Sequence, residues 1–464
     1  MTRNRFKALL VLAFVIVGVC CYQNQQSGSN SNNPNNAGNS AGGDIAETAI
    51  APCPASGDWI NNPQSGPSEV ANGNNSNLCN FYQFSWQWFL AMMNTPDSAS
   101  PTRNYQNQQQ YPQLQLTGNS CTATGDKPAF FVRTIKNKEN NQGDFILPER
   151  TTQAGGGNMI YDQKGNIVLY EVRFSRSQCA LAETNPPASA NFQPGTIELK
   201  ISYRQITAAE APNYVTVNAD INQDGKIDPP ELLGMVGFHF VISTPNHPEF
   251  IWATFEHKQN VPECQLPPSP NAPAWSFASA QCAAKLPNPG NDCGFNAPQA
   301  PVPTPTPVPT PVPLSGGTPT QICRVYHDGS TKGDNNVDTN VFDIDTLNAQ
   351  MVGPKGIITG ITQGPLAVLK NYQMIGAVWV NQDTTSPSFP APATAQNQRG
   401  SIQLTNSTME TTFQQGFNQP VYTGTNNLQP AANCFACHAY DPTQGGNTQV
   451  SHIFDDILNN TSGQ

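Results

Sequence analysis

Apolar segments with a regular period alternate along the chain with polar segments rich in proline and glycine. Residues 80–93 (NFYQFSWQWFLAMM) place apolar side chains three and four positions apart, which predicts a largely buried helix. Residues 167–174 follow a Gly-Asn turn and are rich in β-branched and aromatic types, so they predict a strand. Residues 195–203 (GTIELKISY) alternate and predict a second strand.

Two later segments, 235–243 (MVGFHFVIS) and 250–255 (FIWATF), are almost wholly apolar. Continuous apolar strands are typical of the middle of a sheet, where both faces are covered. The connection between them, 244–249 (TPNHPE), is short. These segments therefore predict two paired central strands.

Two helices are predicted near the C-terminus. Residues 404–417 contain Ser407 and Glu410 in capping-box spacing. Met409, Phe413 and Phe417 follow one another at intervals of four, so they would share one apolar face of the helix. Residues 450–458 (VSHIFDDIL) form an amphipathic pattern whose apolar side could pack on a bound cofactor.

The first 50 residues predict export rather than a folded domain. Residues 1–21 combine basic residues with a short apolar run, the pattern of a signal peptide. The run ends in Cys20 and Cys21, so a lipoprotein with membrane anchoring through an N-terminal lipid is an open alternative, although Val19 is bulky for that signal. Residues 22–50 are mostly Asn, Gln, Ser and Gly and predict a disordered tether.

Beyond the tether, a proline-rich segment separates two parts of the chain. Residues 51–295 are expected to form a β-rich body, and residues 321–464 its remainder together with a C-terminal segment. The segment between them, 296–320, contains VPTPTPVPTPVP, which predicts polyproline II conformation. It is either a linker between domains or a surface loop, and we favour the loop.

Composition narrows the possible functions. The chain has 464 residues, of which 37% are hydrophobic and 12% charged, and its net charge is −10. This acidic balance, without a basic stripe, excludes a nucleic-acid-binding surface. No phosphate-binding glycine loop, nucleophile elbow or HExxH motif is present in the sequence, so hydrolase functions lack support.

Twelve cysteines agree with an exported protein. Four of them belong to the leader and to a CxxCH motif, and the other eight predict disulfides whose pairing the sequence leaves open. These eight are Cys53, Cys79, Cys121, Cys179, Cys264, Cys282, Cys293 and Cys323.

The strongest chemical signal is Cys434-Phe-Ala-Cys437-His438. Two cysteines separated by two residues match the vinyl groups of haem, and the adjacent histidine is placed to bind its iron. The motif predicts haem c, covalently held by Cys434 and Cys437, with His438 as the iron ligand. The predicted fold class is accordingly α+β, a β-rich body with few helices and long loops and a C-terminal helical segment carrying a single c-type haem.

A second axial ligand of the iron has three candidates. Met409 lies on the predicted 404–417 helix, and a Met/His pair is a usual arrangement for raising a haem potential. His257, at the end of an apolar strand, and His239, in the middle of one, are alternative axial ligands, although a lone strand histidine is more often a satisfied core residue. His452 suits cover of the haem better than ligation.

A calcium-type loop is the second motif. Its ligand positions match the 12-residue pattern of donors at positions 1, 3, 5, 7, 9 and 12 with glycine at position 6. The alternative is an acidic turn without metal. The predicted ligands are Asp220, Asn222, Asp224, Lys226 through its carbonyl, Asp228 and Glu231.

The segment LGMVGFHFVISTPNHPEFIWATFEH, with FYQFSWQWFLAMM, DQKGNIVLYEVRF and LTNSTMETTFQQ leading toward CFACH, resembles uncharacterised exported bacterial cytochrome c family proteins. The likeness covers most of the chain from about residue 79 onward. It implies c-type haem at Cys434, Cys437 and His438, and it maps the family's helix motif onto Met409 and Glu410. It implies no reaction, and the calcium-type loop and proline-rich stretch look like insertions.

We therefore expect an exported monohaem c-type protein of the periplasm or cell surface that transfers electrons to or from a redox protein partner. Two alternatives are open. One is a haem enzyme or gas sensor with an open distal site, so the sequence leaves open whether the chain is an enzyme. The other is a structural or binding surface lipoprotein braced by disulfides and calcium.

Overall fold

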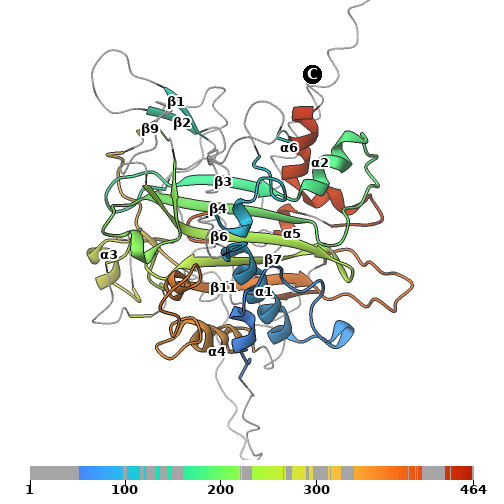
Figure 1. Ribbon diagram of the computed structural model, residues 1–464, viewed down its shortest axis with the longest axis horizontal. Helices are drawn as coiled ribbons and strands as arrows, with labels where there is room; N and C mark the ends of the chain where they lie inside the picture. The colour runs from blue at the N-terminus through green and yellow to red at the C-terminus, as the bar shows by residue number, and fades with distance from the viewer. Residues whose placement is uncertain are drawn as a thin grey trace, which may run out of the picture. The chain divides into compact units, whose positions relative to one another are not determined.

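A seven-stranded antiparallel sheet forms the centre of the fold (Figure 1). From one edge to the other, its strands are β12 (Gln398–Gly400), β11 (Tyr372–Val380), β7 (His247–His257), β6 (Leu232–Thr244), β4 (Ile197–Gln205) and β3 (Leu169–Phe174), and β5 (Thr216–Asn218) pairs with one end of β6. The two central strands, β6 and β7, form a tight hairpin and are buried along nearly their whole length.

The computed structural model describes residues 52–461 apart from 98–101, 115–119, 122–131, 136–144, 149–159, 220, 222–231, 265, 268–273, 289–291, 296–311, 314, 325–338, 395–396, 403, 405, 410–433 and 439. Two small sheets accompany the large one. The first contains β1 (Val132–Ile135), β2 (Phe145–Pro148) and β9 (Val312–Pro313), and the second contains β8 (Gly294–Phe295) and β10 (Ile322–Cys323).

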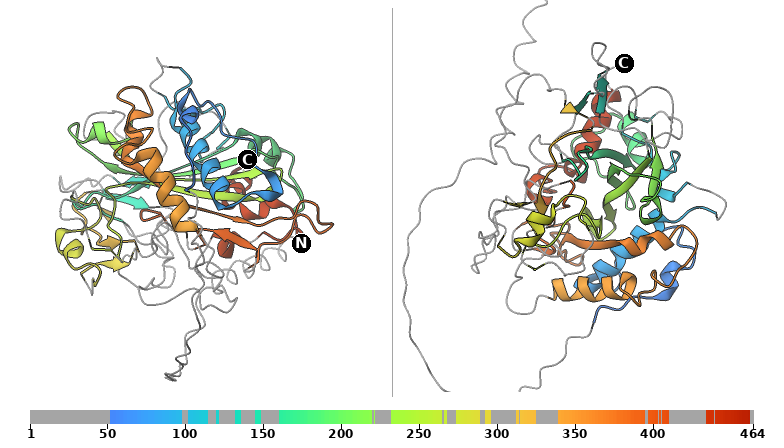
Figure 2. Two further views of the ribbon diagram at one scale, coloured as in Figure 1. Left: turned by 90° about the horizontal axis from the view of Figure 1, so that it is seen from below. Right: turned by 90° about the vertical axis from the view of Figure 1, so that its left-hand side faces the viewer.

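Two helices, α1 (Leu78–Met93) and α4 (Asn340–Val352), cover one face of the sheet (Figure 2). Because side chains alternate along a strand, residues such as Phe238 and Phe255 point to this face. Phe89 of α1 stacks on Phe255 with ring centroids 4.0 Å apart. This is the main apolar core, and it explains why the segment predicted as helix 80–93 is almost entirely buried.

The opposite face carries the C-terminal part of the chain. There α2 (Arg176–Glu183), α5 (Cys434–Cys437) and α6 (His452–Thr461) pack over β3, β4, β6 and β7 (Figure 2). Val241 and Trp252 point to this face and join the same apolar cluster as Phe435 and Phe454. This face also presents polar strand residues, including Lys200 and His239.

Four disulfides link the eight cysteines predicted to form them, and the sequence alone could not give this pairing. The bonds are Cys53–Cys79, Cys121–Cys179, Cys264–Cys323 and Cys282–Cys293. The last two brace the region around α3 (Ala280–Ala284). Such a set is typical of exported proteins. Among the residues that the structure describes, no helix is both long and apolar enough to span a bilayer.

The predicted fold class is confirmed at the level of a β-rich α+β protein built on an antiparallel sheet with few helices. The predicted helix 80–93 lies in α1, the predicted strands lie in β3, β4, β6 and β7, and the amphipathic 450–458 segment contributes to α6. Strands from both sides of the 296–320 segment, β7 and β11, pair directly. Residues 52–464 form one unit.

Two predictions differ from the structure. The first is the helix expected from Leu404, because Ser407–Met409 form a turn; residues 410–433 lie outside the described part of the chain. The turn forms in place of the helix because the backbone N–H and the side-chain hydroxyl of Ser407 both donate to the Glu256 carboxylate. The second is the polyproline segment, whose end at Val312–Pro313 is β9, paired with β2. Proline fits there because β9 is an edge strand.

Substituting Phe89→Ala tests the packing of α1 on the sheet. Phe89 is fully buried and stacks on Phe255, so its truncation removes apolar contacts and leaves a cavity. We expect the free energy of unfolding to fall by about 3–5 kcal/mol in chemical denaturation. Leu266→Ala is the control, because Leu266 is 51% exposed. Its effect should stay within about 0.5 kcal/mol, and equal losses in the two variants would contradict this packing.

Candidate functional site

The CxxCH segment forms one short helix that is anchored to the sheet by its spacer residue. The backbone N–H of His438 donates to the Cys434 carbonyl at 2.8 Å, which closes a helical turn over Cys434–Cys437. Phe435 is buried, and its ring meets the Trp252 ring edge-on at a centroid distance of 6.2 Å. Cys434 lies partly buried against the same cluster. The motif is thus docked on β7.

One hydrogen bond fixes the state of the His438 ring. Its Nδ1 lies 2.7 Å from the Val450 carbonyl oxygen. A carbonyl can only accept, so Nδ1 carries the proton and Nε2 keeps its lone pair. Burial lowers the pKa of His438 well below its ordinary value, and Lys200 adds to this effect. A neutral imidazole whose second nitrogen is held by a carbonyl is the form that binds metals.

The segment that contains Val450 is itself tied to the sheet. Ser451 caps α6 by accepting from the Phe454 N–H at 2.9 Å, and its hydroxyl donates to Glu198 of β4. The same Glu198 oxygen accepts from Gln178 of α2 at 3.0 Å. The orientation of His438 therefore depends on a chain of contacts that ends on a buried carboxylate.

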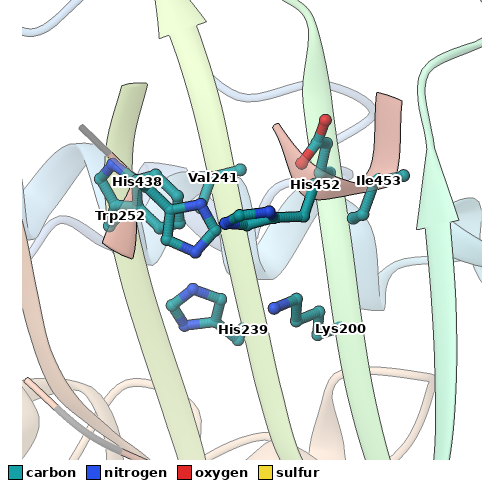
Figure 3. Close-up of a pocket in the computed structure, with 8 residues that line it drawn as sticks. Lys200, His239, Val241, Trp252, His438, His452 and Ile453 are labelled. Carbon is teal, nitrogen blue, oxygen red and sulfur yellow. The ribbon is translucent and has the colours of Figure 1, made fainter. Parts of the chain in front are cut away.

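His438 lines a pocket between the sheet and α6, shown in Figure 3. The pocket is partly open to solvent. Its apolar walls are Val241, Trp252 and Ile453. The complete lining is Glu198, Lys200, His239, Val241, Trp252, His438, His452 and Ile453.

Three histidines meet at this pocket. The His438 ring lies 4.4 Å from the Trp252 ring and 4.6 Å from the ring of His452, measured between centroids. His452 is exposed at the start of α6. His239 is only 6% exposed, and its centroid lies 6.1 Å from that of Trp252. In Figure 3, His239 lies across the pocket from His438 and His452.

His239 has an incomplete set of hydrogen bonds. Its Nδ1 is buried and has no hydrogen-bond partner among the described residues. Burial lowers the pKa of His239 to about 3, helped by Lys200, so its ring is neutral. A buried polar atom without a partner costs about 1–3 kcal/mol, and native structures contain few of them.

The structure does not bring His257 to this pocket. His239 pairs with Thr254 across β6 and β7, and His257, three residues from Thr254, points to the other face of the sheet. Its Nε2 donates to the Asn213 carbonyl at 3.0 Å, and its Nδ1 accepts from the Gln259 N–H at 3.2 Å. Both nitrogens are therefore used by backbone groups, as in a satisfied core histidine.

Met409 is fully buried in the Ser407–Met409 turn and is absent from the described lining of the pocket. The turn lies on β6 and β7. Asn406 donates to Thr254 at 2.9 Å, and a Cβ on Gly237 would lie 2.7 Å from the Thr408 hydroxyl. Met409 thus belongs to a turn that lies over Gly237, which precedes His239 by two residues in β6. The Met409 side chain is not among the described residues that line the pocket.

Glu256 holds that turn in place. It is fully buried, accepts from Ser407 through both oxygens and pairs with Arg324 at 2.6 Å. The described residues 406–409 and the segment WATFEH, which are far apart in the chain, therefore pack on each other. The charge of Glu256 is balanced by a buried arginine that also reaches Glu263.

The sequence interpretation missed Glu198, Lys200 and Trp252 as pocket residues. The available signal was the alternation in IELKISY, which puts Glu198 and Lys200 on one face of β4, beside His239 of β6. His452 and Ile453 of α6 also line the pocket, and the role of α6 in covering a haem stays a prediction.

The predicted calcium ligands Asp220, Asn222, Asp224, Lys226, Asp228 and Glu231 lie outside the described residues. Within the described part of the chain, no group of three or more His, Cys, Asp or Glu side chains is arranged to hold a metal ion. The calcium loop therefore stays a prediction from sequence.

Comparisons with protein-family models, with curated proteins and with solved structures find no match to this chain. The site is therefore interpreted from its own geometry.

Replacing Glu198 by Gln tests the buried carboxylate. Burial raises the pKa of Glu198 from 4.5 to about 7, although Ser451 and Gln178 oppose the shift. The folded state then binds this proton more tightly than the unfolded chain. The free energy of unfolding should therefore fall as the pH rises from about 4.5 to about 7, by up to about 3 kcal/mol.

Glu198→Gln should flatten this part of the pH profile, because the amide oxygen still accepts from Ser451 and Gln178 but cannot ionise. Urea unfolding of both proteins at about pH 5 and about pH 8 measures the difference. An identical loss of stability in the variant would show that Glu198 does not cause it.

Proposed function

We propose that this chain is an exported monohaem c-type cytochrome-like protein that transfers electrons to or from a redox protein partner. In this proposal Cys434 and Cys437 hold the haem covalently, and His438 binds its iron. The observation that carries the proposal is the His438–Val450 hydrogen bond, which leaves the neutral ring with a bare Nε2 at a pocket.

The other side chains that line the pocket are of chemical types that suit such a group. Val241, Trp252 and Ile453 supply apolar surface of the kind a macrocycle needs. The ammonium group of Lys200 could pair with a haem propionate. Lys200 lies beside His239 and Glu198, so the pocket contains both basic and acidic side chains. When bound, haem would supply one-electron chemistry, whereas the chain's residues would orient it and limit its contact with water.

The four disulfides support the exported location. The resemblance to exported cytochrome c family proteins points the same way, as does the signal-like leader. A lipid at Cys20 or Cys21 would place the same site at a membrane surface. The periplasm or the cell surface is therefore the proposed location.

A haem enzyme or gas sensor is a second candidate function, because one specific observation favours it. Glu198, Lys200 and His452 bring ionisable groups to the same pocket as His438. Such groups are able to move protons or bind a small ligand beside a metal. The two functions differ in whether the second axial position is closed.

The double substitution Cys434→Ser with Cys437→Ser should abolish covalent haem. The protein is expressed with its leader in cells that supply haem-attachment machinery, and haem is detected by staining after denaturing electrophoresis. A matched control, Cys53→Ser with Cys79→Ser, also removes two cysteines but breaks a disulfide near α1. Its haem stain should persist. A wild-type protein without covalent haem would refute the proposed function.

A further inference from the structure

We infer that His239 of β6 supplies the second axial ligand opposite His438, so that the iron position is closed by two histidines. This inference rests on the proposed function and specifies it. It selects one of the two alternative histidine ligands and replaces Met409, the residue favoured by the sequence pattern. The supporting observations are the position of His239 in the pocket and the nature of its competitors.

The position of His239 is unusual for a histidine with a purely structural role. It lies in the middle of the apolar strand MVGFHFVIS, between Phe238 and Phe240, in the central strand pair. A histidine kept for structure has its nitrogens satisfied, as His257 does through two backbone groups. His239 instead keeps a buried Nδ1 without a partner among the described residues. That Nδ1 is enclosed, so a ligand in the pocket could reach the His239 ring only through Nε2.

The neighbours of His239 do not use it. Thr254, directly opposite on β7, directs its hydroxyl to the Phe238 carbonyl at 3.4 Å and accepts from Asn406 at 2.9 Å. On the other side, Lys200 of β4 pairs with His239 in register. Neither strand neighbour therefore makes a described hydrogen bond to the His239 ring.

The pocket geometry separates His239 from the other candidates. His452 makes edge-on ring contact with His438 at 4.6 Å, so it lies beside that ring and not across a space from it. Trp252 occupies the other near position at 4.4 Å. His239 contacts the same Trp252 from the sheet and lies across the pocket. Met409 is in the turn over Gly237 and does not line the pocket.

Two histidine ligands have consequences that a Met/His pair or an open site does not share. His239 and His438 would both bind the iron through nitrogen, so the spectrum should be low-spin in both oxidation states and unaffected by CO. The midpoint potential should be lower than with methionine, since Met/His ligation raises it. A closed site also favours electron transfer over gas sensing.

The test compares His239→Ala with Met409→Leu and His257→Ala, the other two sequence candidates for this ligand, in the exported full chain. Visible spectra are taken of the oxidised, reduced and CO-treated protein, after staining confirms covalent haem in each. His239→Ala should become high-spin and bind CO, and added imidazole should restore the low-spin spectrum. The two controls should keep the wild-type spectrum. A low-spin, CO-insensitive His239→Ala, or loss of low-spin character in Met409→Leu, would overturn the assignment.

A second variant keeps the assignment testable if His239→Ala does not fold. His239→Met offers a competent but weaker donor at the same position, so it should remain low-spin with a raised midpoint potential. An unchanged potential in this variant would also overturn the assignment. Absence of covalent haem from the wild type would instead refute the proposed function, so the two failures are distinguishable.

Discussion

The hydrogen bond from His438 Nδ1 to the Val450 carbonyl is the constraint on which the proposed site depends. It fixes the tautomer of the histidine and directs the lone pair of its other nitrogen away from the backbone. The bond exists only because Val450 is held, and Val450 is held because Ser451 caps α6 while donating to Glu198 on the sheet. A local motif of five residues thus obtains its geometry from a strand more than two hundred residues earlier.

In the proposed function, the site draws on much more of the chain than the CxxCH motif. The sheet has one face that α1 and α4 cover and that supplies most of the core, and a mixed face that carries Lys200, His239 and Trp252. The short helix α5 is too small to enclose a haem by itself. The mixed face supplies the wall, the cation and the proposed second ligand, so the site is built from β4, β6 and β7 as much as from the C-terminus.

The sequence predicted those helices and strands that follow from the spacing of apolar residues along the chain. The apolar runs of β6 and β7 and the spacing of α1 are strong local signals, and the even set of cysteines indicated disulfides. Parts that depend on tertiary contacts were not predictable. The 404–409 segment carries a helix signal, yet the buried carboxylate of Glu256 holds Ser407 in a turn. Likewise, only the strand register brings His239 rather than His257 to the pocket of His438.

The central claim is that Cys434, Cys437 and His438 form a haem attachment site on this sheet. The most direct measurement is the intact mass of the exported wild-type protein, followed by peptide mapping of the CFACH segment. The account predicts a mass increase equal to one haem, carried on the peptide that contains both cysteines. A mass without haem, with Cys434 and Cys437 joined to each other by a disulfide, would contradict it.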